Sequence, residues 1–227
     1  MKKLLLALLL LVVAANVGFG ASLCTSFGTL SGLIGTGAAG CDYNGINFNN
    51  FGLFAGGTQA AQVQATAIGV AFNSVGSVID LSFNPGWDVS VGQSFDARIV
   101  YTVNAPVLAL GLGYTGFTVF QNGGTTTVSE NYWVNCTSFN AIGCGGPTGS
   151  LGITSGGPTF ASVNLGQNSS ITVSKDILAD ATNVQGSGIA VHLSGVDNLV
   201  TIPEPLTLGL MGFGLLGVGI FGRRAKK

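Results

Sequence analysis

The chain has 227 residues, of which 37 are glycine and only 7 % are charged. The formal net charge is −1, and between residues 21 and 202 eight acidic residues stand against two basic ones. A surface of this sign attracts neither nucleic-acid phosphates nor anionic lipids, so nucleic acid is excluded as an expected partner. Without its two apolar ends, the chain is long enough for one ordinary domain.

The N-terminal residues have the pattern of a secretory signal peptide. Residues 1–3 include two lysines, residues 4–15 form an apolar run, and Gly18-Phe19-Gly20 places small residues before a cleavage point. We therefore expect a signal peptide over residues 1–20, with cleavage after Gly20 or, as an alternative, after Ala15. A buried N-terminal helix is disfavoured because the apolar run has no polar face.

Four cysteines, Cys24, Cys41, Cys136 and Cys144, follow in the exported part of the chain. An oxidising compartment and an even count predict two disulfides, for which three pairings exist. We favour Cys24–Cys41 and Cys136–Cys144 because both are local, and each would contribute roughly 2.5–3 kcal/mol. A four-cysteine zinc site is the alternative, but spacings of 17 and 8 residues lack the short knuckles of such sites. We expect no metal and no cofactor.

Short strands separated by turn residues dominate residues 21–202. Between residues 95 and 103 every second residue is apolar or aromatic: Phe95, Ala97, Ile99, Tyr101 and Val103. The same period of two recurs at Ile79-Leu81-Phe83, Phe117-Val119, Ile171-Val173 and Ile189-Val191-Leu193. Turn signals occur at residues 84–86, 122–124 and 156–158. The pattern predicts an all-β fold, an antiparallel β-sandwich of jelly-roll-like form over residues 21–202.

Four other segments carry individual expectations. Residues 63–72 are predicted to form a strand with a bulge near residues 67–68, and residues 175–182 are the one candidate for an amphipathic helix. The glycine-rich residues 143–158 are expected to form a long surface loop. Residues 194–202 are expected to form a linker.

The titratable residues give no catalytic pattern. His192, the only histidine, is expected on the polar face of a strand, and no serine lies in a Gly-x-Ser-x-Gly elbow. Paired carboxylates for glycoside cleavage would have to come from Asp80, Asp88, Asp96 and Glu130. Asp96 is instead expected to form a solvated ion pair with Arg98 on its strand, and Glu130 to lie at a strand start. We expect the protein not to be an enzyme.

Aromatic residues offer a binding hypothesis. Trp87, Trp133 and Tyr132, with Tyr114, could stack against sugar rings, because aromatic faces suit apolar pyranose surfaces. The alternative, which we favour, is that they fill the sandwich core.

The C-terminal segment combines three features in order. Pro203-Glu204-Pro205 keeps the backbone extended, and the uncharged residues 206–222 would form a helix of about 25 Å, marginal against a hydrocarbon core of about 30 Å. The chain then closes with the basic residues Arg223, Arg224, Lys226 and Lys227. Such cations stay cytoplasmic, so residues 21–202 would lie outside the membrane.

This order of features resembles the PEP-CTERM sorting signal, over residues 203–227. The resemblance implies that an exosortase-type transpeptidase recognises Pro203, Glu204 and Pro205 and removes or transfers the tail. It also implies export to the envelope, outer surface or extracellular matrix of a Gram-negative, exopolysaccharide-producing bacterium, with exopolysaccharide as a candidate partner and transient membrane anchoring. It leaves the role of residues 21–202 open, between a structural or interaction protein and a carbohydrate-binding module or adhesin.

Overall fold

A computed structural model of the chain describes residues 22–120, 123–136, 138, 141–168 and 170–203. The expected signal peptide and the expected membrane segment 206–222 therefore lie outside the described residues. Within the described part of the chain, no helix is both long enough and apolar enough to cross a membrane.

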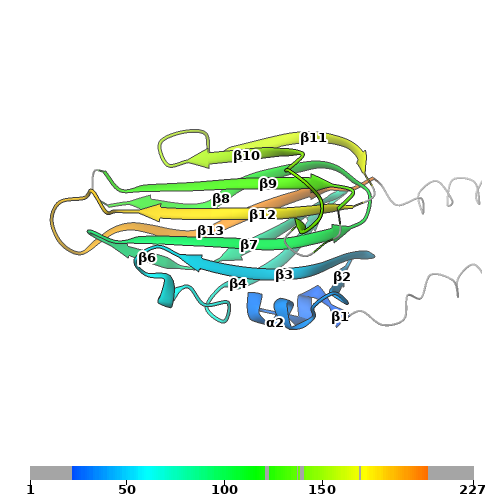
Figure 1. Cartoon of the computed structure of the whole chain (residues 1–227), viewed down its shortest axis with the longest axis horizontal. Coiled ribbons are helices and arrows are strands. Elements are labelled where there is room, and N and C mark those ends of the chain that lie inside the picture. The colour runs from blue at the N-terminus through cyan, green and yellow to red at the C-terminus, as the bar shows by residue number, and fades with distance from the viewer. Residues whose placement is uncertain (1–21, 121–122, 137, 139–140, 169, 204–227) are drawn as a thin grey trace, which may run out of the picture.

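Two β-sheets pack face to face (Figure 1). In spatial order the first sheet contains β1 (Ser22–Leu23), β2 (Cys41–Tyr43), β3 (Ile46–Gly56), β7 (Ser94–Asn104), β12 (Ile171–Asp180), β9 (Thr125–Val134) and β10 (Gly149–Thr154). The second contains β11 (Phe160–Asn168), β8 (Val107–Val119), β13 (Ile189–Thr201), β5 (Val78–Asn84) and β4 (Gly69–Val75), with β6 (Trp87–Ser90) paired to β13. All pairs are antiparallel except β1 with β2. The predicted antiparallel β-sandwich is confirmed.

The strand order is that of a jelly roll. Strands β7, β12, β9 and β10 of the first sheet face β5, β13, β8 and β11 of the second. From β5 to β13 the chain passes to the opposite sheet at each connection, except from β5 to β6 and at the β9–β10 hairpin. Each central strand is therefore paired with strands distant in sequence, the arrangement produced by two interlocked Greek keys.

The core lies between the sheets and follows the alternation of the strands. The five residues predicted to share one face of β7, from Phe95 to Val103, are all at most 2 % exposed. Ile79, Leu81 and Phe83 of β5 are buried as well, and so are Ile171 and Val173 of β12. In β13 Val191 and Leu193 are buried, whereas Ile189 at the strand's start is 43 % exposed.

Two predictions for the C-terminal half are wrong. Residues 175–180 belong to β12 and not to a helix, because Lys175 faces the core with a charged partner there. Residues 194–201 are the second half of β13, in the middle of the second sheet, and not a linker. The polar residues that resembled a linker include Asn198, whose side chain is buried and hydrogen-bonded.

Irregular segments account for the other corrections. Strand β4 begins only at Gly69, after the 3₁₀ helix η2 (Ala60–Gln62) and a turn, so the predicted strand over residues 63–72 is wrong in its first half. The predicted loop over residues 143–158 contains β10. A short helix that the sequence did not predict, α2 (Leu30–Gly35), follows the 3₁₀ helix η1 (Cys24–Ser26), and Thr29 caps it by accepting a hydrogen bond from the Gly32 amide.

Both predicted disulfides are present. Cys24–Cys41 joins η1 to β2 over 17 residues, and Cys136–Cys144 closes a loop of eight residues after β9. Both bonds are local, as their spacing predicted, and all four cysteines are used.

Candidate functional site

The segment that carries the sorting signal continues directly from the central strand of the second sheet. Thr201 pairs with Val78 and Ala109 on its two sides. The Ile202 amide donates to the Ser77 carbonyl at 2.9 Å, and the Ile202 side chain is 7 % exposed. The described fold therefore includes Pro203, which is half-buried. Glu204, Pro205 and the four basic residues of the tail lie outside the described residues.

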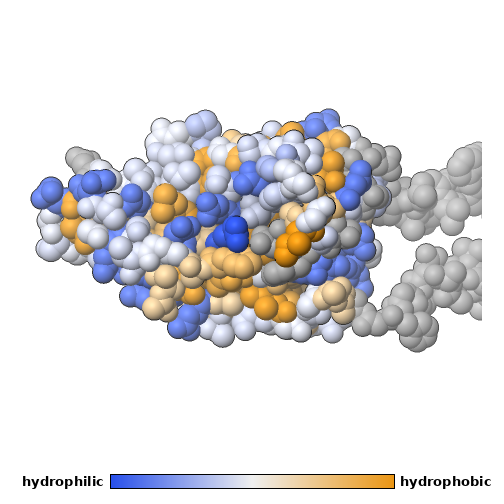
Figure 2. Space-filling view, in the orientation of Figure 1, coloured by the Kyte–Doolittle hydropathy of each residue, from blue (hydrophilic) through white to orange (hydrophobic). Residues whose placement is uncertain are grey.

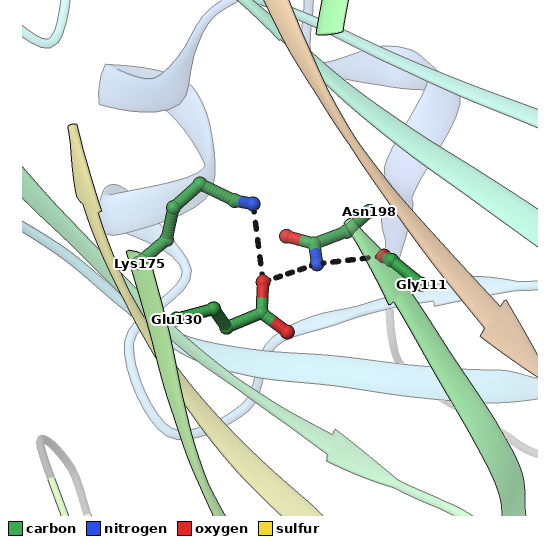
Figure 3. A network of polar contacts seen from close by, with 4 residues as sticks. All are labelled: Gly111, Glu130, Lys175 and Asn198. Carbon is green, nitrogen blue, oxygen red and sulfur yellow. Dashed lines mark hydrogen bonds and ion pairs between the residues drawn. The ribbon is translucent and has the colours of Figure 1, made fainter. Parts of the chain in front are cut away.

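A charged network is buried between the two sheets (Figure 3). Lys175 of β12 and Glu130 of β9 are direct cross-strand partners, and Lys175 Nζ lies 3.1 Å from Glu130 Oε2. Asn198 of β13, in the opposite sheet, donates through Nδ2 to the same carboxylate oxygen and to the Gly111 carbonyl at 3.3 Å. The network connects the sheets, and both charged side chains are 0 % exposed.

Burial dominates the electrostatics of this network. Burial lowers the pKa of the Lys175 ammonium, while the negative charge of Glu130 and its hydrogen bond raise it. Burial also raises the pKa of the Tyr101 hydroxyl well above its usual value, and the nearby Glu130 charge adds to this. Glu130 was predicted at a strand start. It lies in the middle of β9, and its full burial makes it a structural residue that solvent-borne substrates do not reach.

A hollow of about 290 Å³ opens on the outer face of the first sheet, and Figure 2 shows this face. Its lining residues come from β3, β7 and β12: Phe54, Ala55, Gly56, Asp96, Arg98 and Asp176. Phe54, Arg98 and Asp176 form one row across the three strands, because Arg98 pairs with Phe54 on one side and with Asp176 on the other. In the next row Asp96 pairs with Gly56 and with Leu178.

The side chains of the hollow contact one another. The Arg98 guanidinium carbon lies 4.4 Å from the centre of the Phe54 ring, and Arg98 Nε is buried without a hydrogen-bond partner. Burial is the largest cause that raises the pKa of Asp176, followed by the charge of Asp96 and a hydrogen bond between the two carboxyl groups. The Arg98 charge opposes this increase. Among the described residues, ion pairs within 4.0 Å form at Lys175–Glu130 and at His192–Asp88, so the predicted Asp96–Arg98 pair is not formed.

Another part of the same face is buried next to Cys136. Thr172 of β12 donates through its hydroxyl to the Cys136 carbonyl at 2.8 Å and shares a 3.0 Å hydrogen bond with the Thr102 hydroxyl. Both threonines are at most 1 % exposed. The outer face of the first sheet is therefore closed at Thr102 and Thr172, next to Cys136, and open at the hollow.

The predicted aromatic residues are separated by the fold. Trp87 stacks on Phe95 at 5.3 Å in the core, and Tyr132 is also buried, as the core interpretation predicted. Trp133 is half-buried on the outer face, where its indole nitrogen donates to the Gly145 carbonyl at 3.1 Å. Half-buried Tyr114 donates to the Thr126 carbonyl at 2.9 Å, and burial raises its pKa to about 12. The structure does not bring Trp87, Trp133 and Tyr132 together as a surface platform.

Two further polar contacts lie on the second sheet. His192 Nδ1 lies 2.6 Å from Asp88 Oδ1, both side chains partly exposed, which fits the predicted position of His192 on a polar strand face. Burial, and then the charge of Asp197, raise the pKa of Asp80, while Ser82 donates to its carboxylate. Sequence reasoning missed the hollow, because its residues lie on three strands whose neighbours only the sheet topology defines.

Comparisons with known proteins match the C-terminal tail to a sequence family and the sandwich to solved structures. The model of the PEP-CTERM protein-sorting motif matches residues 201–226, so the chain carries this motif. The motif indicates an exported protein that is targeted to the cell envelope. No curated protein matches the chain.

Solved structures similar to the chain include carbohydrate-binding proteins. TmCBM61 in complex with β-1,4-galactotriose is 11 % identical at a TM-score of 0.27 and covers 64 % of this chain and 86 % of its own. The mannan-recognising module TmCBM27 is 10 % identical at a TM-score of 0.26, and the match covers 66 % of this chain and 88 % of TmCBM27. The CBM22-1 xylan-binding domain of Paenibacillus barcinonensis Xyn10C is 10 % identical at a TM-score of 0.24, and the match covers 67 % of this chain and 88 % of that domain. None of these likenesses is close enough to indicate what this chain binds.

Proposed function

We propose that the chain is an exported bacterial surface protein that presents its jelly-roll sandwich as a non-catalytic interaction module. Residues 206–222 hold it in the membrane, with the basic tail cytoplasmic, until an exosortase-type transpeptidase acts at Pro203-Glu204-Pro205. The supporting observation is the sorting motif over residues 201–226, which begins on the last residue of β13. The processed segment therefore adjoins the folded domain without an intervening linker.

A non-catalytic role agrees with the arrangement of the carboxylates. Glu130 is fully buried against Lys175. Asp88 is paired with His192 at 2.6 Å, and Asp96 lines the hollow together with the Arg98 guanidinium.

The mature C-terminus tests the sorting proposal. Mass spectrometry of the protein from the native surface fraction is expected to show a C-terminus upstream of Lys227. A chain ending intact at Lys227 would contradict processing and leave only a simple anchor. Replacing Pro203, Glu204 and Pro205 together by alanine should retain the unprocessed chain in the membrane, because the apolar run and the basic residues remain.

Deletion of residues 203–227 tests anchoring separately. The deletion leaves β13 whole, because the strand ends at Thr201 and the last core residue is Ile202. We expect the shortened protein in the medium. Retention at the envelope would contradict an anchoring role for the tail.

A further inference from the structure

The hollow on the first sheet combines polar groups of opposite kinds with apolar surface. Its two carboxyl groups accept hydrogen bonds, and the Arg98 guanidinium donates them. Phe54, 37 % exposed, contributes apolar area inside the hollow. Leu178, 39 % exposed, is the cross-strand neighbour of Asp96. Sugars present the same combination of hydroxyl groups that donate and accept and C–H faces that are apolar.

Other ligand classes fit the hollow less well. Calcium takes six to eight oxygen ligands, whereas two carboxyl groups line this site and the Arg98 charge lies beside them. An anionic ligand such as a uronic acid would meet those two carboxyl groups against a single guanidinium. A neutral ligand has neither difficulty.

The backbone keeps the site open at Gly56. A Cβ added to Gly56 would lie 2.9 Å from Asp96 Oδ2, so a larger residue at this position shifts the Asp96 carboxylate from its place. The volume, about 290 Å³, is near the lower limit for small-molecule sites and suits one sugar residue better than a long ligand. Because the hollow lies on a sheet face, a longer chain can extend beyond it along the row of residues that continues to Gly152 on β10.

We propose that this hollow binds a single sugar residue within a neutral polysaccharide, with Asp96, Asp176 and Arg98 contacting hydroxyl groups and Phe54 contacting a C–H face. This assignment rests on the proposed role as a surface interaction module, to which it adds a ligand class. Sugar binding by the purified protein does not require surface display. The ligand is a sugar, as in the aromatic hypothesis, but the site is a different one. None of Trp87, Trp133 and Tyr132 lines the hollow.

Affinity electrophoresis of the full chain, purified in mild detergent, tests the proposal. The probes are four neutral polysaccharides, dextran, galactomannan, xyloglucan and arabinoxylan, together with the acidic polysaccharide alginate. We expect at least one neutral polysaccharide to retard the protein and alginate not to do so. No retardation by any of the four, or equal retardation by alginate, would overturn the assignment.

Matched glycine variants locate the site. Gly56→Ala displaces the Asp96 carboxylate at a backbone position without positive φ, and is expected to weaken retardation at least tenfold. Gly152→Ala is the control: Gly152 lies on β10 in the row of Phe54, Arg98 and Asp176, and its added Cβ would have only one neighbour, at 3.9 Å. Retardation unchanged in Gly56→Ala, or lost equally in Gly152→Ala, would remove the hollow as the site.

A second pair of variants does not depend on the backbone. Asp176→Ala should abolish retardation, whereas Asp88→Ala, which removes a carboxylate from the second sheet, should leave it unchanged. Thermal unfolding of each variant shows whether the fold is retained. The experiments distinguish failure of the sugar site from failure of the sorting proposal. A protein that is processed and displayed, but not retarded by any polysaccharide, contradicts only the assignment of the hollow.

Discussion

Replacing Lys175 by methionine leaves the buried Glu130 carboxylate without its cationic partner. Methionine has a similar length, so the change removes the charge with little loss of packing volume. Glu130 Oε1 already has no hydrogen-bond partner, and Oε2 would retain only the Asn198 amide. The carboxylate must then stay ionised in a site of 0 % exposure or take up a proton.

The expected loss is large because both charges are fully buried. Removing one partner of a buried pair costs about 3–5 kcal/mol in the free energy of unfolding. At about 2–4 °C per kcal/mol for a domain of this size, the unfolding temperature should fall by roughly 6–20 °C. The double variant Lys175→Met/Glu130→Gln should recover most of this loss. Its glutamine carries no charge and still offers an oxygen to Asn198.

Thermal and guanidinium unfolding of the four proteins in this cycle, followed by circular dichroism, measures the coupling. We expect the sum of the two single losses in unfolding free energy to exceed the loss in the double variant by about 2 kcal/mol or more. If the losses simply add, Lys175 and Glu130 do not stabilise each other, and the reasoning from buried charge is wrong. If the Lys175→Met protein does not accumulate in cells, the double variant still should, because its glutamine carries no unpaired charge. Failure of both to accumulate would contradict the reasoning.

Three further outcomes are expected. Cys144→Ser opens the bond to Cys136 and should cost about 2.5 kcal/mol, while limited proteolysis should cut first within the freed loop over residues 137–148, and cleavage elsewhere first would contradict this. Asp80→Asn should stabilise the fold at pH 7 by on the order of 0.5 kcal/mol. Because burial and Asp197 raise the folded-state pKa of Asp80, the carboxylate destabilises the fold once ionised; the gain should therefore vanish below about pH 4, and a constant gain at all pH values would refute this sign. Trp133→Phe should remove most of the tryptophan fluorescence that iodide quenches, and unchanged quenching would show that the buried indole is accessible.

The sequence predicted the features that depend on local pattern. The alternation from Phe95 to Val103 identified a strand and its buried face, because side chains in a strand point to opposite sides in turn. The spacing of the cysteines identified both disulfides. The order of Pro203-Glu204-Pro205, an uncharged run and basic residues identified the sorting motif, since a motif read in extended form needs no tertiary contact.

Features that depend on contact between distant strands could not be read from the sequence. Lys175 resembled a solvent-facing residue of a helix until β9 placed Glu130 beside it, and Asn198 resembled a linker residue until β13 was paired on both sides. The hollow is the clearest case. Phe54, Asp96 and Asp176 are separated by at least 40 residues along the chain, and they share a surface only because the jelly-roll order sets β3, β7 and β12 side by side. Local pattern thus determined most of the core strands and the sorting motif, whereas the pairing of strands distant in sequence decided which side chains form a site.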